Sequence, residues 1–211
     1  MTTVTQSGRR AGFEWAVAEA PHPGEEVSGD AAVVVDLGAS RLLAVIDGLG
    51  HGEAASIAAG EAVRTVEANS TEPLDDLLLL CHEALQSTRG AAMTLALVDT
   101  ESASMEWVGV GNVEAHLVRG GPSGLMPIHG PVLSGGIVGF NLPRVAVRQV
   151  ELRHGDFIVI ATDGISPAFD HNLRLGLDVA TLAVQVVDSC SKGTDDSLVL
   201  VSRYWGEDER S

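Results

Sequence analysis

The order of apolar runs along the chain restricts its fold more than any other feature of the sequence. Two short β-branched runs, AAVVVDL (31–37) and RLLAVID (41–47), flank a Gly-Ala-Ser turn and predict an antiparallel strand pair. Two stretches with helical spacing of apolar residues follow, at 53–69 and 74–87. Because strands and helices come in blocks and do not alternate one for one, the sequence predicts an α+β layered sandwich rather than a doubly wound parallel sheet.

Beyond residue 90 the apolar pattern becomes that of strands. Short runs separated by Gly, Ser or Asp predict an antiparallel meander, interrupted by a loop rich in Gly and Pro at 130–143. The expected strands occupy 91–100, 104–111, 113–120, 124–130, 144–152, 156–163 and 197–204, and a further helix is expected at 177–190. Since neither a repeat nor a linker interrupts the pattern, residues 1–211 are expected to form a single domain.

Charge and composition exclude several function classes. The 211-residue chain has a formal net charge of -16, which argues against nucleic acid as a partner, because phosphate backbones are held by Lys and Arg. No stretch approaches the roughly 20 apolar residues that span a bilayer, so no membrane partner is expected and the protein is predicted to be soluble and cytoplasmic. Cys81 and Cys190 lie in apolar patterns and are expected to be reduced core thiols.

Acidic residues recur at the ends or edges of predicted strands, beside small residues. Two of them form Asp-Gly pairs, which are common in turns, but the recurrence of the pattern favours a shared site. Hard divalent cations such as Mg²⁺ prefer oxygen ligands, and a glycine such as Gly48 lets its carbonyl approach an ion closely. The sequence therefore predicts a divalent-metal site built from strand-terminal carboxylates. The positions are Asp30, Asp47, Asp163, Asp195 and Asp196.

In their order along the chain, these motifs resemble those of the SpoIIE branch of the metal-dependent type 2C serine/threonine phosphatases, and within it the RsbX type associated with the bacterial stressosome. The resemblance covers about 13–204 and is carried by SGD, AVIDGLGHG, RGAAMTLALVD, GVGN, TDGI and TDDSLVLV. It implies an αββα sandwich, two antiparallel sheets flanked by helical pairs, with two Mn²⁺ or Mg²⁺ ions between the sheet edges.

The resemblance also implies roles for the acidic residues. Asp47 would bridge two metal ions. The Gly48 carbonyl would bind one ion and Asp163 the other, with Asp30 in or near the cluster. Asp195 and Asp196 both stay candidates, because Ser197 follows the acid pair directly whereas relatives often read Asp-Asp-x-Thr.

His51 has two interpretations. As a general acid it would protonate the leaving oxygen of a phosphoester; as a structural residue it would only precede the helix that begins near Gly52. The broader type 2C family commonly carries a histidine directly after its Asp-Gly, whereas His51 lies three residues later. The remaining histidines show no paired ligand spacing and are not expected to bind zinc. They are His22, His82, His116, His129, His154 and His171.

Together these features predict a phosphatase acting on phosphoserine or phosphothreonine in proteins. The resemblance implies phosphorylated STAS-domain proteins of a stressosome or anti-sigma pathway as substrates. Two alternatives stay open: a catalytically inactive phosphatase fold that serves as a binding module, and a hydrolase of small phosphoesters. No basic cluster accompanies the acidic motifs, so bound metals alone are expected to hold the phosphoryl group, and the loop at 130–143 is expected to help dock a folded substrate.

Overall fold

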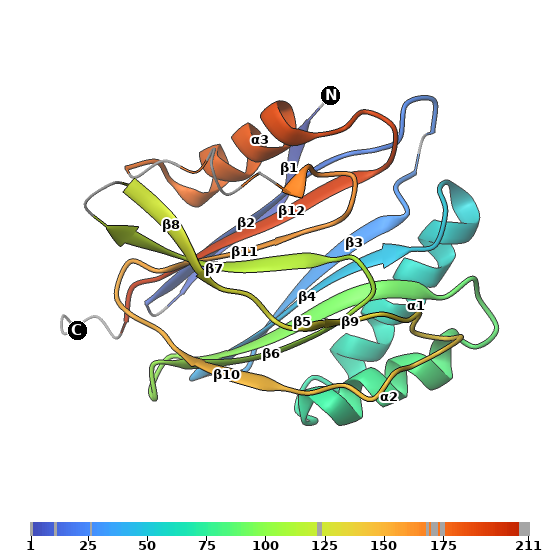
Figure 1. Cartoon of the computed structure of the whole chain (residues 1–211), viewed down its shortest axis with the longest axis horizontal. Coiled ribbons are helices and arrows are strands. Elements are labelled where there is room, and N and C mark those ends of the chain that lie inside the picture. Colours follow the sequence, from blue (N-terminus) through green and yellow to red (C-terminus); the bar gives the residue numbers. More distant parts are fainter. Residues whose placement is uncertain are drawn as a thin grey trace.

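Two antiparallel β-sheets pack face to face and form the centre of the molecule (Figure 1). The computed structural model describes residues 2–10, 12–25, 27–121, 124–167, 169, 173 and 176–206. The first sheet has the strand order β1 (Thr3–Arg10), β2 (Phe13–Ala20), β12 (Ser197–Tyr204), β11 (Phe157–Ala161), β7 (Glu114–Gly121) and β8 (Gly124–His129). The second has the order β10 (Arg148–Glu151), β6 (Ser104–Val110), β5 (Ala91–Asp99), β4 (Ser40–Gly48) and β3 (Asp30–Asp36), with the short β9 (Leu133–Ser134) parallel to β6.

Helices cover the outer faces of both sheets. The helices α1 (Glu53–Ala68) and α2 (Leu74–Leu85) lie on the second sheet, and α3 (Val179–Cys190) lies on the first (Figure 1). The side chain of Asp178 accepts a hydrogen bond from the Thr181 backbone N–H and so caps the start of α3. The predicted αββα layering is confirmed, although within the described residues the first sheet is covered by one helix instead of a pair.

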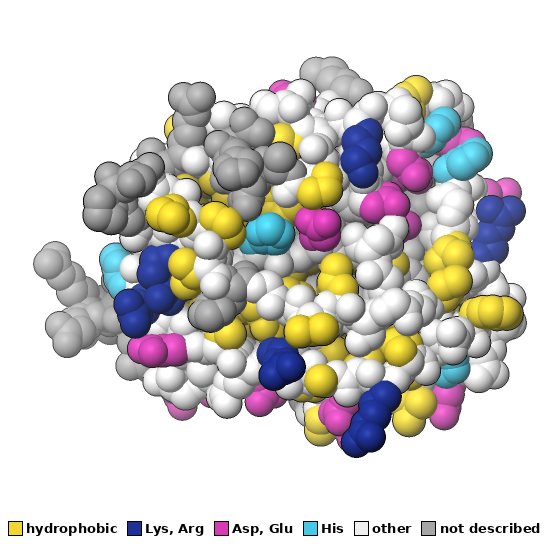
Figure 2. Space-filling view, viewed as in Figure 1, with side chains coloured by type: hydrophobic (Ala, Val, Ile, Leu, Met, Phe, Trp, Pro, Cys, Tyr) yellow, Lys and Arg dark blue, Asp and Glu magenta, His cyan; other side chains and the backbone are white. Residues whose placement is uncertain are grey.

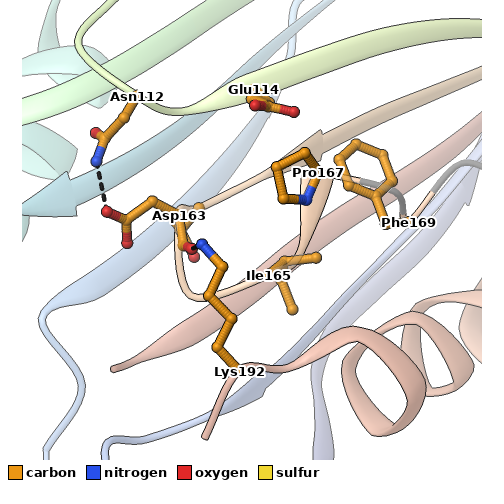
Figure 3. Close-up of a pocket in the computed structure, with 8 residues that line it drawn as sticks. Asn112, Glu114, Asp163, Ile165, Pro167, Phe169 and Lys192 are labelled. Atoms are coloured by element: carbon orange, nitrogen blue, oxygen red, sulfur yellow. Dashed lines mark hydrogen bonds between the residues drawn. The ribbon is translucent and has the colours of Figure 1, made fainter. Parts of the chain in front are cut away.

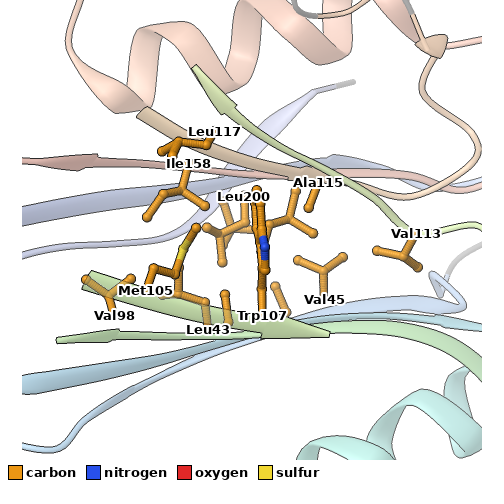
Figure 4. Close-up of a cluster of buried hydrophobic side chains, with 14 of the residues drawn as sticks. Leu43, Val45, Val98, Met105, Trp107, Val113, Ala115, Leu117, Ile158 and Leu200 are labelled. Carbon is orange, nitrogen blue, oxygen red and sulfur yellow. The ribbon is translucent and has the colours of Figure 1, made fainter. Parts of the chain in front are cut away.

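The core consists of a layer between the sheets and a layer under the helices of each sheet. In β4, Leu43 and Val45 face the other sheet, while Leu42 and Ile46 face α1 and α2. Burial of both faces explains why this strand is apolar without alternation. Between the sheets, Trp107 of β6 extends from one sheet toward the other and fills the space (Figure 4).

The expected strands and helices are present, with three differences. Only Arg148–Glu151 of the segment expected at 144–152 is a strand, the short β9 lies inside the expected loop, and the N-terminal hairpin of β1 and β2 was not expected. Cys81 and Cys190 are buried, as expected. In the part of the chain that the structure describes, the helices are too short or too polar to cross a membrane.

The glycines of the two Asp-Gly pairs lie where backbones approach closely. A Cβ atom on Gly164 would lie 1.8 Å from the carbonyl oxygen of Asp196, and one on Gly48 would lie 2.3 Å from that of Ala55. A real side chain cannot occupy either position without moving the backbone. Each Asp-Gly pair therefore positions its aspartate where two elements meet.

Replacing Gly164 with Ala should lower the free energy of unfolding by about 2 kcal/mol or more, because the methyl group must displace the start of β12. Gly135→Ala is the matched control, since a Cβ there meets no heavy atom within 4 Å. Urea denaturation of both variants measures the difference. Equal midpoints for Gly164→Ala and Gly135→Ala would contradict the close approach.

Candidate metal centre

The five predicted aspartates come from neighbouring ends of the two sheets. Asp30 and Asp47 are opposite one another in the register of β3 and β4. Asp163 follows β11, and Asp195 and Asp196 precede β12. Because β11 and β12 belong to the other sheet, the carboxylates meet where the two sheets come together.

The electrostatics of Asp47 confirm this proximity. Burial raises the pKa of its carboxyl group from an ordinary 3.8 to about 7, and the negative charges of Asp163, Asp195 and Asp196 add to the rise. Like charges held close together disfavour the ionised form of each. Asp47 therefore lies within reach of carboxylates from both loops of the other sheet.

Asp30 is one of two buried residues among these acids; the other is Asp196. Burial, and next the charge of Asp47, raise the pKa of its carboxyl group well above the ordinary range. The Thr162 hydroxyl donates a hydrogen bond of 2.7 Å to Asp30 Oδ2, which partly offsets this rise. Asp30 is thus held by a hydroxyl that follows β11 of the other sheet.

Asp195 and Asp196 differ in their hydrogen bonds. Both carboxylate oxygens of Asp196 accept backbone N–H groups, at 2.7 Å from His22 and 2.8 Å from Gly29, and its side chain is buried. Asp195 is half-buried, and one of its oxygens accepts the N–H of Asp196. Asp196 therefore ties the 21–29 loop to the start of β12, while Asp195 keeps an oxygen available to a cation.

The donor set fits a hard divalent cation. The ligand atoms that the five aspartates and the Gly48 carbonyl offer are all oxygens, which Mg²⁺ and Mn²⁺ prefer. Gly48 lies at the end of β4 beside Asp47, and its N–H donates to the Gly29 carbonyl at 3.0 Å, which fixes the backbone. Burial first, and then the neighbouring carboxylates, raise the pKa of Asp47, and a bound cation would favour its ionised form.

Two polar residues that the sequence interpretation missed hold Asp163 (Figure 3). Asn112 Nδ2 donates to Asp163 Oδ2 at 2.6 Å, and Lys192 Nζ donates to the Asp163 backbone carbonyl. Both residues line a pocket beside Asp163 that also includes Glu114 and Phe169. Asn112 belongs to the GVGN motif and Lys192 lies shortly before the acid pair, but only the packing of the sheets brings them to Asp163.

The sequence predicts no basic cluster beside the acids, and the structure adds single basic residues near them. Lys192 lies at Asp163, and Figure 2 shows a basic side chain beside acidic ones in the upper part of the viewed face. A Cβ on Gly50 would lie 2.8 Å from the guanidinium of Arg89, so this arginine lies against the loop that follows Asp47. Positive charge therefore reaches the site from two separate segments.

His51 lies in the turn between β4 and α1, and its hydrogen bond and ring contact are with residues other than the five aspartates. Its Nδ1 is 2.9 Å from Glu25 Oε1, its ring stacks on His22, and its side chain is 56% exposed. In the described part of the chain, its hydrogen-bond partner is thus Glu25 and none of the five aspartates. His171 lies outside the described residues, as does the side chain of His129.

Metal-free protein should lose stability as the pH rises. Asp47 has a pKa of about 7 when folded and about 3.8 when unfolded, so between these values the native state holds a proton that the unfolded chain releases. The free energy of unfolding should fall across this window, by as much as about 4 kcal/mol from Asp47. Asp47→Asn should flatten this decline, and thermal melts in chelator from pH 4 to 8 measure it. A parallel decline in the variant would contradict the shift.

Comparison with known proteins finds a matching family and a related enzyme. The family described as "Stage II sporulation protein E (SpoIIE)" matches residues 38–204. Phosphoserine phosphatase RsbX of Bacillus subtilis (strain 168) is 26% identical over 165 residues, which are 76% of this chain and 79% of that protein.

Solved structures show the same architecture. RsbX in complex with magnesium superposes with a TM-score of 0.83 at 22% identity, over 94% of this chain and 98% of that one. A chain from a structural study of the bacterial stressosome, a modular system adapted to control secondary messenger signaling, has a TM-score of 0.81 at 29% identity, over 90% of this chain and 99% of that one. The chain belongs to the SpoIIE family, and its sandwich is the type 2C phosphatase fold.

Proposed function

We propose that this protein is a metal-dependent phosphatase that dephosphorylates phosphoserine or phosphothreonine in a regulatory protein of stress signalling. The observation that carries the proposal is the convergence of carboxylates from both sheets at Asp47. The similarity to phosphoserine phosphatase RsbX and to a stressosome protein supports the substrate class. In this proposal the substrates are phosphorylated STAS-domain proteins, and the reaction takes place in the cytoplasm.

In this proposal Asp47, Asp163, Asp195 and the Gly48 carbonyl hold two divalent ions, either Mn²⁺ or Mg²⁺. When bound, such ions lower the pKa of a shared water and neutralise the phosphoryl oxygens. Asn112 holds the Asp163 carboxylate in one orientation through its 2.6 Å hydrogen bond. Asp30 lies opposite Asp47 on the neighbouring strand and, through Thr162, links β3 to the end of β11.

Asp196 acts as a positioning residue. Its two oxygens already accept hydrogen bonds from the backbone of the 21–29 loop, which leads directly into Asp30. Satisfied buried acceptors of this kind are costly to remove. We therefore assign metal binding to Asp195 and the placement of Asp30 to Asp196.

Lys192 gives the pocket beside Asp163 a positive charge. Its ammonium lies at the Asp163 carbonyl and has further donors available toward the pocket. The phosphoryl group of a substrate brings more negative charge to a chain that already carries -16. Lys192 thus assists the metals, which replaces the expectation that metals act alone.

A general-acid role for His51 is not part of this proposal. Its Nδ1 engages Glu25 and its ring stacks on His22, so its bonding belongs to that group of side chains. An inactive binding module is disfavoured because a scaffold gains nothing from carboxylates that raise one another's pKa. A hydrolase of small phosphoesters is distinguished by assaying a nucleotide beside the phosphoprotein.

Asp47→Asn and Asp195→Asn should each lower phosphatase activity by about a hundredfold or more, because each removes a charge that holds the cations. Asp75→Asn, at an exposed position in the first turn of α2, is the control and should retain full activity. The assay follows release of phosphate from a phosphorylated STAS-domain protein with Mn²⁺, with Mg²⁺ and with chelator. Wild-type turnover by Asp47→Asn in saturating Mn²⁺ would refute the assignment.

The loop at 130–143 offers a surface for a folded substrate. Phe140 is 82% exposed and Val132 is 58% exposed, whereas Val138 is buried and anchors the loop through hydrogen bonds with Ala91. The loop thus combines a fixed base with exposed apolar side chains.

Phe140→Ser should lower kcat/KM for a folded phosphoprotein about tenfold and leave a peptide with the same phosphosite unaffected. Met126→Ser, at an exposed apolar position on β8, is the control and should alter neither value. Steady-state kinetics on both substrates provide the measurement. An equal loss on protein and peptide would place Phe140 in folding or catalysis instead of docking.

A further inference from the structure

A second group of potential metal ligands lies next to the acidic centre. His22 and Glu25 are in the 21–29 loop that follows β2, and His51 is in the turn between β4 and α1. One ligand atom from each side chain lies within 4.8 Å of the other two. These residues were not expected to act together, because His22 and His51 are far apart in sequence.

At least one nitrogen of this group has no hydrogen-bond partner among the described residues. The rings of His22 and His51 are stacked, with centroids 4.8 Å apart and planes inclined by 13°. Nδ1 of His22 is buried and has no hydrogen-bond partner among the described residues. A buried polar atom in this condition has lost its water without compensation, which costs free energy unless a ligand satisfies it.

We propose that His22, Glu25 and His51 form a binding site for a transition-metal ion that prefers imidazole ligands, such as Zn²⁺ or Co²⁺. Two imidazoles and one carboxylate are a common ligand set for Zn²⁺, with a fourth position open to water. The 2.9 Å between His51 Nδ1 and Glu25 Oε1 is close to the roughly 3.3 Å between neighbouring ligands of a tetrahedral ion with 2.0 Å bonds.

Completing the site requires the three side chains to close by about 1 to 2 Å, judged against those bond lengths. The more exposed members can make this movement, since the side chains of His51 and Glu25 are 56% and 34% exposed. His22 provides the fixed side, because its backbone N–H is bound to Asp196 at 2.7 Å.

This site differs from the acidic centre in the chemistry of its ligands. The acidic centre offers only oxygen, which suits Mg²⁺ and Mn²⁺, whereas two of three ligands here are nitrogen. The two sites share a support, since Asp196 holds the backbone of His22 on one side and that of Gly29, next to Asp30, on the other. An ion at the histidine site would therefore restrain the 21–29 loop, which leads into Asp30.

The test counts Zn²⁺ ions retained by the whole protein in equilibrium dialysis, in the presence of excess Mg²⁺. Wild type should retain one more Zn²⁺ per chain than His22→Ala or His51→Ala, and the affinity for that ion should fall about tenfold or more in Glu25→Gln. His154→Ala removes a histidine that contacts Trp205 and is the control, with no expected loss. Asp47→Asn should also keep this ion, because it alters only the acidic centre.

Circular dichroism of each variant checks that it is folded. If His22→Ala does not fold, His51→Ala decides the result, because the exposed His51 side chain can be removed with little effect on folding. Retention of the same number of Zn²⁺ ions by His51→Ala and wild type would overturn the proposal. Loss of the ion in Asp47→Asn, with retention in His51→Ala, would assign the bound Zn²⁺ to the acidic centre and also overturn it.

Discussion

The repulsion between carboxylates at the junction of the two sheets is the interaction on which the rest of the structure depends. Asp47 is buried and faces the charges of Asp163, Asp195 and Asp196, and its pKa rises to about 7 as a result. A sandwich that needed only stability would place apolar side chains here. In the proposed function this repulsion has a use, because the same oxygens are the ligands that hard divalent cations prefer.

The surrounding structure holds these acids in place chiefly through close backbone packing and hydrogen bonds. Gly48 and Gly164 let backbones approach so closely that the aspartates before them have fixed positions. Thr162 and Asn112 each donate a hydrogen bond to one of the acids, and Asp196 gathers the backbone of the 21–29 loop. The centre is therefore built before a cation arrives, so little binding energy is lost to reorganisation.

The sequence predicted the parts of this site that depend on local pattern. The opposite placement of Asp30 and Asp47 follows from two apolar runs joined by a tight turn, and the helices follow from apolar spacing. The N-terminal hairpin escaped prediction because Phe13 and Val17 alternate with alanines that are buried under α3, so its pattern is not that of a half-exposed strand.

Contacts between distant segments depend on how the two sheets pack, and the local sequence pattern does not predict that packing. Lys192 contacts Asp163, and His22 contacts His51; each pair comes from loops that are distant in sequence. The different hydrogen bonds of Asp195 and Asp196 could not be predicted from spacing either, because they depend on which carboxylate lies at the N–H groups of His22 and Gly29.

The most direct measurement of the central claim is anomalous diffraction from crystals grown with Mn²⁺. The account predicts two anomalous peaks between the sheet edges, with Asp47 in contact with both ions, Asp163 and Asp195 in contact with one each, and Asp196 still bonded to the backbone of His22 and Gly29. Peaks that involve Asp196 in place of Asp195, or the absence of any peak at Asp47 in saturating Mn²⁺, would contradict it.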